Sequence, residues 1–123
     1  ELMSALMFIE DEQVLVVLLY RPPVINQQQI QTFIDELTYE LLELHVDQYN
    51  TIILGDFNLD QMHEPYVELF HGICMEFLLT QRSNYSTHIY GGILDLVFHN
   101  KKQKPVEWMP SPYSDHFVLT IDV

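Results

Sequence analysis

The chain has 123 residues, of which 48% are hydrophobic and 19% are charged, and its formal net charge is −13 at pH 7. This length and composition predict one globular domain over residues 1–123 and exclude an intrinsically disordered chain. The acidic charge disfavours tight non-specific binding to nucleic-acid phosphates and favours divalent cations or a basic partner.

Membrane and secretory classes are not expected for this sequence. No apolar run is long enough to span a bilayer, and no basic-then-apolar signal stands at the start. The single cysteine, Cys74, excludes an internal disulfide and fits a reducing compartment. We therefore expect an intracellular protein in which Cys74 is a small buried hydrophobe.

The first elements are expected to be two strands. Residues 1–9 mix Leu, Met, Ala and Phe, and the polar residues 11–13 form a turn after them. Residues 14–20 are a continuous, valine-rich apolar run, which is typical of a buried strand. Pro22 and Pro23 end this strand because proline cannot donate a hydrogen bond to a neighbouring strand.

Residues 27–46 predict a long helix with one apolar stripe. The stripe consists of Ile30, Phe33, Ile34, Leu37, Leu41 and Leu44. The acidic residues outside the stripe indicate a solvated face, with a docking face for a basic partner as the alternative. The helix leads to an apolar strand at 51–54, so we expect a strand-helix-strand unit with a parallel strand pair.

The later elements are less regular. A second helix is expected after Pro65, which suits a first helical turn. The elements expected after it are a short strand at 77–80, a polar loop at 81–90, a strand at 93–98, a turn at 100–104, a loop at 111–114 and a strand at 117–123.

The strand at 51–54 runs into Gly55, Asp56, Phe57 and Asn58. Gly55 is expected to let the chain turn at the strand end. Asp56 and Asn58 then lie past the carboxyl end of a central strand, where open α/β sheets place ligands. A carboxylate there can orient or deprotonate a water, and an amide can hold an oxyanion. The alternative is an Asx-turn, in which Asp56 only caps the loop.

A second polar signal is Asp95, which interrupts the apolar strand at 93–98. Burying its carboxylate is costly without a partner, and Asp115-His116 supplies a candidate imidazole. The alternative is that Asp95 caps a loop and His116 is a surface histidine.

Five polar residues share a position at strand ends or strand-loop junctions: Asp56, Asn58, Asp95, Asp115 and His116. Such carboxylates favour a hard cation, Mg²⁺ or Mn²⁺, and the histidine suits a phosphate oxygen. Zinc is disfavoured because no histidine pair has the spacing of a metal-binding helix and paired thiolates are absent.

Four ordered segments carry a family resemblance: residues 20–23 (Tyr-Arg-Pro-Pro), 55–58 (Gly-Asp-Phe-Asn), Thr87-His88 with 91–98, and 114–116 (Ser-Asp-His). Together they resemble the endonuclease/exonuclease/phosphatase family, most closely the apurinic-type endonuclease domains of non-LTR retrotransposons. The resemblance implies a DNase I-like α/β sandwich of two similar halves, truncated here to roughly the C-terminal half. The family's early asparagine and metal-binding glutamate have no counterpart in this sequence.

The resemblance also implies residue roles. Asp56 would orient or deprotonate the attacking water, and Asn58 would bind a phosphate oxygen. Tyr20 would help to position the phosphate. Thr87 and His88 would lie in a segment that approaches the substrate.

The remaining roles concern the metal and the scissile phosphate. Asp115 would help to hold the divalent ion. His116 would contact the scissile phosphate, oriented by Asp95. The metal and these donors would stabilise the charge that develops in an in-line displacement.

We therefore expect Mg²⁺-dependent phosphodiester hydrolysis by a retroelement-derived DNA endonuclease domain, nuclear if it acts on DNA. The alternative is a catalytically impaired, truncated nuclease fold that dimerises or binds a protein. Half of a sandwich would leave an apolar sheet face in water, which pairing of two copies could cover. A nucleotide or lipid-headgroup phosphatase is a third possibility, because the family includes both.

Overall fold

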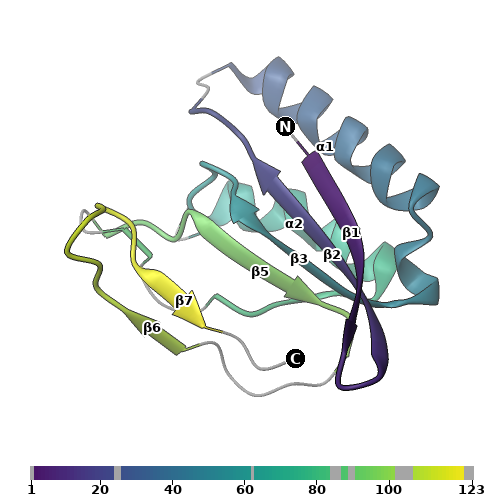
Figure 1. Ribbon diagram of the computed structural model, residues 1–123. Coiled ribbons are helices and arrows are strands. Elements are labelled where there is room, and N and C mark those ends of the chain that lie inside the picture. The colour runs from purple at the N-terminus through teal and green to yellow at the C-terminus, as the bar shows by residue number, and fades with distance from the viewer. Residues whose placement is uncertain are drawn as a thin grey trace.

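A five-stranded mixed sheet forms the centre of the fold, as the computed structural model in Figure 1 shows. The structure describes residues 2–23, 26–61, 63–83, 87–88, 91–101 and 107–120. The strands lie in the order β1 (Leu2–Ile9), β2 (Glu12–Tyr20), β3 (Asn50–Asp56), β5 (Asp95–His99) and β4 (Thr80–Gln81).

The pairing of the strands follows from their connections. β1 and β2 form an antiparallel hairpin through Glu10 and Asp11, which both have positive φ, as tight hairpin turns require. β2 and β3 are parallel and are joined by a helix, so the predicted strand-helix-strand unit is confirmed. β5 is antiparallel to both β3 and β4.

Helix α1 (Gln27–Glu43) begins at Asn26, whose side chain accepts a hydrogen bond from the Gln28 N–H. The helix is shorter than predicted. His45 has positive φ, and Val46–Gln48 forms a separate 3₁₀ turn, η1, that leads into β3.

Helix α2 (Glu64–Phe77) carries Pro65 in its first turn, as predicted, and buries Phe70, Ile73 and Phe77. The predicted strand at 77–80 is wrong, because Phe77 is the last helical residue. Leu78 caps the helix in the left-handed conformation, and β4 begins only at Thr80.

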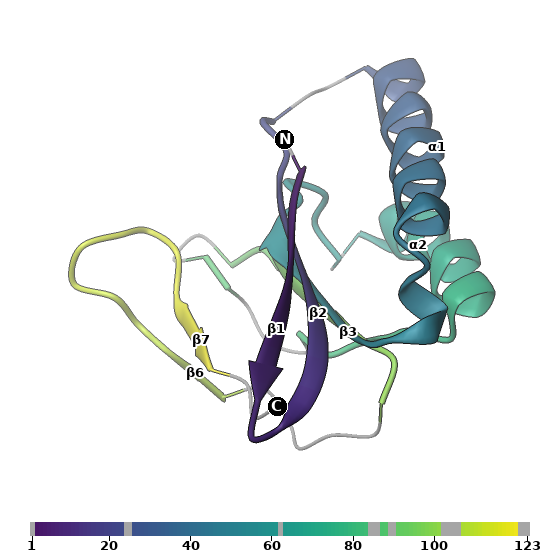
Figure 2. The same ribbon diagram turned by 45° about the vertical axis from the view of Figure 1, so that its right-hand side comes forward.

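Both helices cover the same face of the sheet, and the main core lies between this face and the helices (Figure 2). Phe57 is fully buried at its centre and meets the rings of Phe33, Phe70 and Phe98 edge-on, at centroid distances of 6.2, 5.4 and 5.6 Å. Cys74 is half-buried against this core, and burial raises the pKa of its thiol.

The opposite face of the sheet carries a smaller apolar cluster of Val14, Ile52 and Val97. A hairpin of β6 (Glu107–Met109) and β7 (Val118–Thr120) lies on this side, and Leu119 packs against the cluster (Figure 2). β6 was not expected from the sequence, because three residues are too few to show the alternation of a strand. All three are exposed in the structure.

Other predicted boundaries also shift. β5 begins at Asp95 rather than at residue 93, and Gln81 belongs to β4 rather than to a loop. The loop at 111–114 is confirmed. Parts of the predicted segments 81–90, 100–104 and 117–123 lie outside the described residues, namely 84–86, 89–90, 102–104 and 121–123.

Gly55 does not form the turn that the sequence predicted, because it lies within β3, paired with Leu19. A Cβ atom at this position would lie 1.8 Å from the Leu19 carbonyl oxygen. The glycine therefore permits the close approach of β2 to β3. The turn itself comes later, at Asn58, where φ is +48°.

We predict that Gly55→Ala destabilises the domain by about 3 kcal/mol or more, because the added methyl group forces β2 away from β3. Gly72→Ala is the matched control: a Cβ there meets nothing within 4 Å. Since Gly72 lies within α2, we expect that variant to gain up to about 1 kcal/mol. Urea unfolding of the two variants measures both changes, and equal stabilities would contradict this role of Gly55.

Candidate active site

Three polar side chains lie in one row across the sheet. Tyr20 ends β2, Asp56 ends β3 and Asp95 begins β5, and the strand register pairs Tyr20 with Asp56 and Asp56 with Asp95. Cross-strand partners point to the same face, here the face opposite the helices. Tyr20 is half exposed, whereas the Asp56 and Asp95 side chains are only 21% and 20% exposed.

The two oxygens of the Asp56 carboxylate have different neighbours. Oδ1 accepts a hydrogen bond of 3.1 Å from the Asn58 N–H, so the Asx-turn that the sequence offered as an alternative is present. Oδ2 points toward His116. Burial, and then the neighbouring charge of Asp95, raise the pKa of the Asp56 carboxyl.

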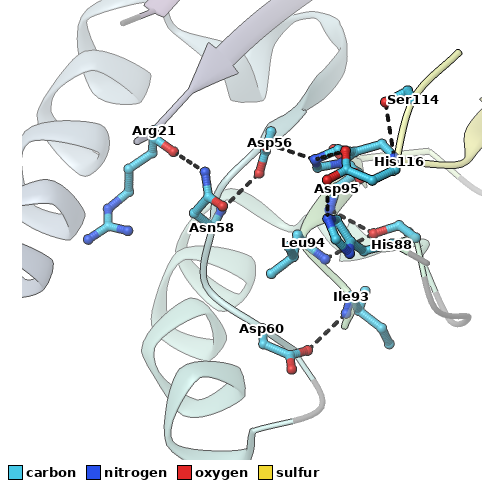
Figure 3. A network of polar contacts seen from close by, with 12 residues as sticks. Arg21, Asp56, Asn58, Asp60, His88, Ile93, Leu94, Asp95, Ser114 and His116 are labelled. Atoms are coloured by element: carbon cyan, nitrogen blue, oxygen red, sulfur yellow. Dashed lines mark hydrogen bonds and ion pairs between the residues drawn. The ribbon is translucent and has the colours of Figure 1, made fainter. Parts of the chain in front are cut away.

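His116 joins the two carboxylates (Figure 3). Its Nδ1 lies 2.6 Å from Asp95 Oδ2, and its Nε2 lies 3.6 Å from Asp56 Oδ2. Burial lowers the pKa of His116, but the hydrogen bond and charge of Asp95, followed by the charges of Asp56 and Asp115, raise it above its ordinary value. The charged imidazolium is therefore favoured between the carboxylates.

Backbone contacts hold His116 in this position. Its N–H donates to Ser114 Oγ at 3.0 Å, and it forms an isolated antiparallel bridge with His88. The next N–H, that of Phe117, donates to the Thr87 carbonyl at 2.7 Å. The loop before β7 is thus fixed to the segment around residue 87.

His88 and Asp115 extend the cluster on the other side of His116. His88 Nε2 lies 3.0 Å from Asp115 Oδ2, and His116 Nε2 lies 3.9 Å from Asp115 Oδ1. The two imidazole rings meet edge-on at a centroid distance of 4.9 Å. Since the Asp115 side chain is 53% exposed, the cluster opens to solvent at this carboxylate.

Thr87 contacts the start of β5. It is only 1% exposed, and its Oγ1 accepts hydrogen bonds from the Leu94 and Asp95 N–H groups, both at 3.0 Å. A side chain so placed positions the first residue of β5. A contact between Thr87 and substrate stays a prediction, whereas His88 lies in the cluster.

Asn58 lies beside the row, with its side chain turned toward Arg21 (Figure 3). Its Nδ2 donates to the Arg21 carbonyl, so one of its amide hydrogens serves the backbone. A contact between Asn58 and a phosphate oxygen would use the remaining donor capacity and stays a prediction.

Arg21 has a positioning role that sequence reasoning missed. Its N–H donates to the Asp56 carbonyl at 2.9 Å, and its guanidinium lies 5.3 Å above the Phe33 ring. The guanidinium is buried, and Nη1 lies 3.5 Å from the Phe57 carbonyl. Arg21 thereby fixes the loop after β3 to the end of β2. The sequence signal for this role is a single arginine between an apolar strand and two prolines.

Asp60 is a second positioning residue that sequence reasoning missed. Its Oδ1 accepts from the Ile93 N–H at 2.8 Å, beside backbone bonds from Phe57 to Leu94 and from Gln61 to Ile93. The loop after β3 is therefore joined to the segment that enters β5. Its spacing of two residues from Asn58 was the only sequence signal.

The candidate site is this polar cluster rather than a deep cavity. A cavity of about 910 Å³ lies elsewhere, between α1 and the end of β2, and includes Tyr20 and Arg21 in its lining. The cluster brings three carboxylates and two imidazoles together, so the chemistry is assigned there.

No protein-family model matches the chain, and neither does any curated protein or solved structure. Among the described helices, none combines the length and the apolar character needed to cross a bilayer.

We predict that Asp95→Asn lowers the pKa of His116, because the amide keeps the burial and removes the charge. An NMR titration of the imidazole nitrogens in the presence of a chelator measures this pKa. The wild-type value should exceed the ordinary 6.5. Asp47→Asn, an exposed change in η1, is the control and should leave it unchanged.

The same shift has a consequence for stability. Because the folded pKa of His116 is raised, its contribution to the free energy of unfolding is complete below pH 6.5 and is lost as pH rises through the folded value. This pH-dependent component should diminish in Asp95→Asn. An unchanged His116 pKa in that variant would contradict the pairing.

Proposed function

We propose that the chain is a divalent-cation-dependent phosphodiesterase of the endonuclease/exonuclease/phosphatase type, acting as a retroelement-derived DNA endonuclease domain. The single observation that supports this most is His116, bonded to Asp95 and facing Asp56 across 3.6 Å. The four ordered sequence segments that resemble this family bring their polar residues to this same edge of the sheet.

Asp56 is the proposed group that orients or deprotonates the attacking water. Its Oδ1 is used by the Asx-turn, which leaves Oδ2 for this role. Burial and the charge of Asp95 raise the pKa of Asp56, which makes its carboxylate a stronger base than an exposed aspartate.

His116 presents Nε2 at the point where a phosphate oxygen, or a cation bound to it, would lie. The 3.6 Å between Nε2 and Asp56 Oδ2 exceeds a normal hydrogen bond, so the two groups can share a ligand between them. Tyr20, in the same row, would contact the phosphate from the β2 side.

The side chains present suit a divalent cation, with Mg²⁺ or Mn²⁺ the expected one. Asp115 would supply an oxygen ligand in a group with His88 and His116, and Asp95 holds the His116 imidazole. When bound, the cation would withdraw charge from the phosphate and stabilise the transition state. The net charge of −13 predicts weak affinity for DNA in the absence of the cation.

We also propose that the sheet with its two helices corresponds to one half of a DNase I-like sandwich. In this view the face that carries Tyr20 and Leu18, both about half exposed, is the one that a second sheet would cover.

We predict metal-dependent cleavage of supercoiled plasmid or of an abasic oligonucleotide, with Mg²⁺ or Mn²⁺ and not with EDTA. Asp56→Asn and His116→Asn should each reduce the rate by about 100-fold or more. Asp47→Asn and His71→Asn, exposed residues in η1 and on α2, are the matched controls and should cleave normally.

The melting temperature of Asp56→Asn shows whether a loss of activity is caused by unfolding. The amide can still accept the Asn58 N–H and no longer carries a charge whose burial is unfavourable, so the melting temperature should not fall. A folded wild-type chain that cleaves neither substrate with any divalent cation would overturn the proposed activity.

Self-association through β1 is a second candidate function, and a specific feature favours it. β1 is the edge strand of the sheet, and residues 2–9 contain no charged residue and no proline. Met3, Met7 and Phe8 are 69%, 46% and 75% exposed. Natural edge strands usually carry charges that prevent pairing, so an antiparallel pairing of β1 with the β1 of a second copy is the proposed contact.

We predict that Ala5→Lys, in the middle of β1, weakens this dimer at least about 10-fold, because antiparallel pairing would bring the lysines of the two copies close together. Gln31→Lys adds the same charge on the exposed surface of α1 and is the control. Analytical ultracentrifugation over a range of concentrations measures both. A wild-type chain that stays monomeric throughout would exclude this function.

A further inference from the structure

The donor atoms around His116 are not the set that magnesium prefers. Mg²⁺ and Mn²⁺ are bound in proteins mainly by oxygen, whereas imidazole nitrogen suits later transition metals such as Zn²⁺, Ni²⁺ and Cu²⁺. Two imidazoles, those of His88 and His116, lie in the cluster together with the carboxylate of Asp115. Magnesium therefore fits this part of the site less well than a transition metal does.

The geometry brings these three side chains to one point. His88 Nε2 lies 3.0 Å from Asp115 Oδ2, His116 Nε2 lies 3.9 Å from Asp115 Oδ1, and one ligand atom from each residue lies within 4.8 Å of the others. Ligands bound to one ion at about 2.1 Å stand roughly 3.0–3.5 Å apart. Side-chain movements of about an ångström would therefore close the site.

The orientation of His116 is also that of a metal ligand. Its Nδ1 is engaged by Asp95 Oδ2 at 2.6 Å, which leaves Nε2 directed at Asp115 and Asp56. A carboxylate that holds the other ring nitrogen is the usual partner of a metal-bound histidine. Asp95 is itself fixed by the bond from its N–H to the buried Thr87 hydroxyl.

The backbone holds the two histidines together from distant parts of the chain. His88 and His116 form an antiparallel bridge, and the Phe117 N–H donates to Thr87. Their separation in sequence gives no sign of a metal pair, which is why the sequence alone disfavours zinc. The bridge replaces the helical spacing that such sites otherwise use.

We propose that His88, Asp115 and His116 bind a first-row transition-metal ion, with Asp56 as an additional carboxylate beside it, and that His88 sets the preference for such an ion over Mg²⁺. This inference specifies the cation of the proposed hydrolase site and rests on that function only for its catalytic meaning. With the ion bound, His116 Nε2 is a ligand, and the ion takes the place that faces the phosphate.

Binding can be measured without activity. Co²⁺ is titrated into the chelator-treated chain, and its visible absorption is followed, with Mg²⁺ and Zn²⁺ added as competitors. The wild-type chain should bind one Co²⁺ that Zn²⁺ displaces and excess Mg²⁺ does not. His88→Asn should weaken Co²⁺ binding at least about 10-fold, and Asp95→Asn, through the orientation of His116, by about 10–100-fold.

The matched control is His71→Asn, which removes an exposed histidine from α2 and should leave Co²⁺ binding unchanged. A second measurement needs no variant. Substoichiometric Mn²⁺ should broaden the imidazole NMR signals of His88 and His116 before those of His71 and His45.

The outcomes separate this proposal from the proposed activity. Metal-dependent cleavage without Co²⁺ binding, or Co²⁺ binding that His88→Asn leaves unchanged, would overturn the transition-metal site alone. Co²⁺ binding at His88 and His116 without cleavage would support the site and count against the hydrolase.

Discussion

Two carboxylates face each other across neighbouring antiparallel strands, and the rest of the site depends on this opposition. The register of β3 and β5 pairs Asp56 with Asp95 directly, an arrangement of like charges that is unfavourable in a sheet. The imidazole of His116 lies between them, within 2.6 Å of one carboxylate and 3.6 Å of the other. A cationic ring, or a metal ion bound to it, reduces the repulsion between the carboxylates. This attraction stabilises the position of the His116 loop at the edge of the sheet.

The residues around this edge hold the backbone in place. Thr87 fixes the start of β5, Arg21 fixes the loop after β3 to the end of β2, and Asp60 joins that loop to the segment before β5. Gly55 allows β2 and β3 to approach closely beneath the row. A partly buried carboxylate such as Asp56 is unfavourable for stability, and this surrounding structure is what keeps it in place.

The acidic surface and the histidine cluster have a common interpretation. A chain with a net charge of −13 repels an anionic substrate unless a cation intervenes, and the cluster collects the side chains that could hold one. The exposed apolar residues on the open face of the sheet and on β1 point to a different property, contact with another sheet or strand. Tyr20 belongs to both the open face and the polar row, whereas the edge strand β1 lies apart from the cluster at the ends of β3 and β5.

The sequence by itself determined the elements whose signals are local. Continuous apolar runs identified β2 and β3, the 3.6-residue stripe identified α1, and polar residues at strand ends identified Asp56, Asp95 and His116 as a potential group. The prediction of a strand at 77–80 was wrong because the last apolar residues of a helix resemble the first residues of a strand. The boundary between the two is set by the left-handed conformation of Leu78, which the sequence does not reveal. Only the tertiary structure placed His88 beside His116 and Asp115, buried Arg21 and set the Thr87 hydroxyl against the start of β5. These contacts join residues far apart in the chain, and their distances are set by strand register and packing, which leave no periodic trace in the sequence.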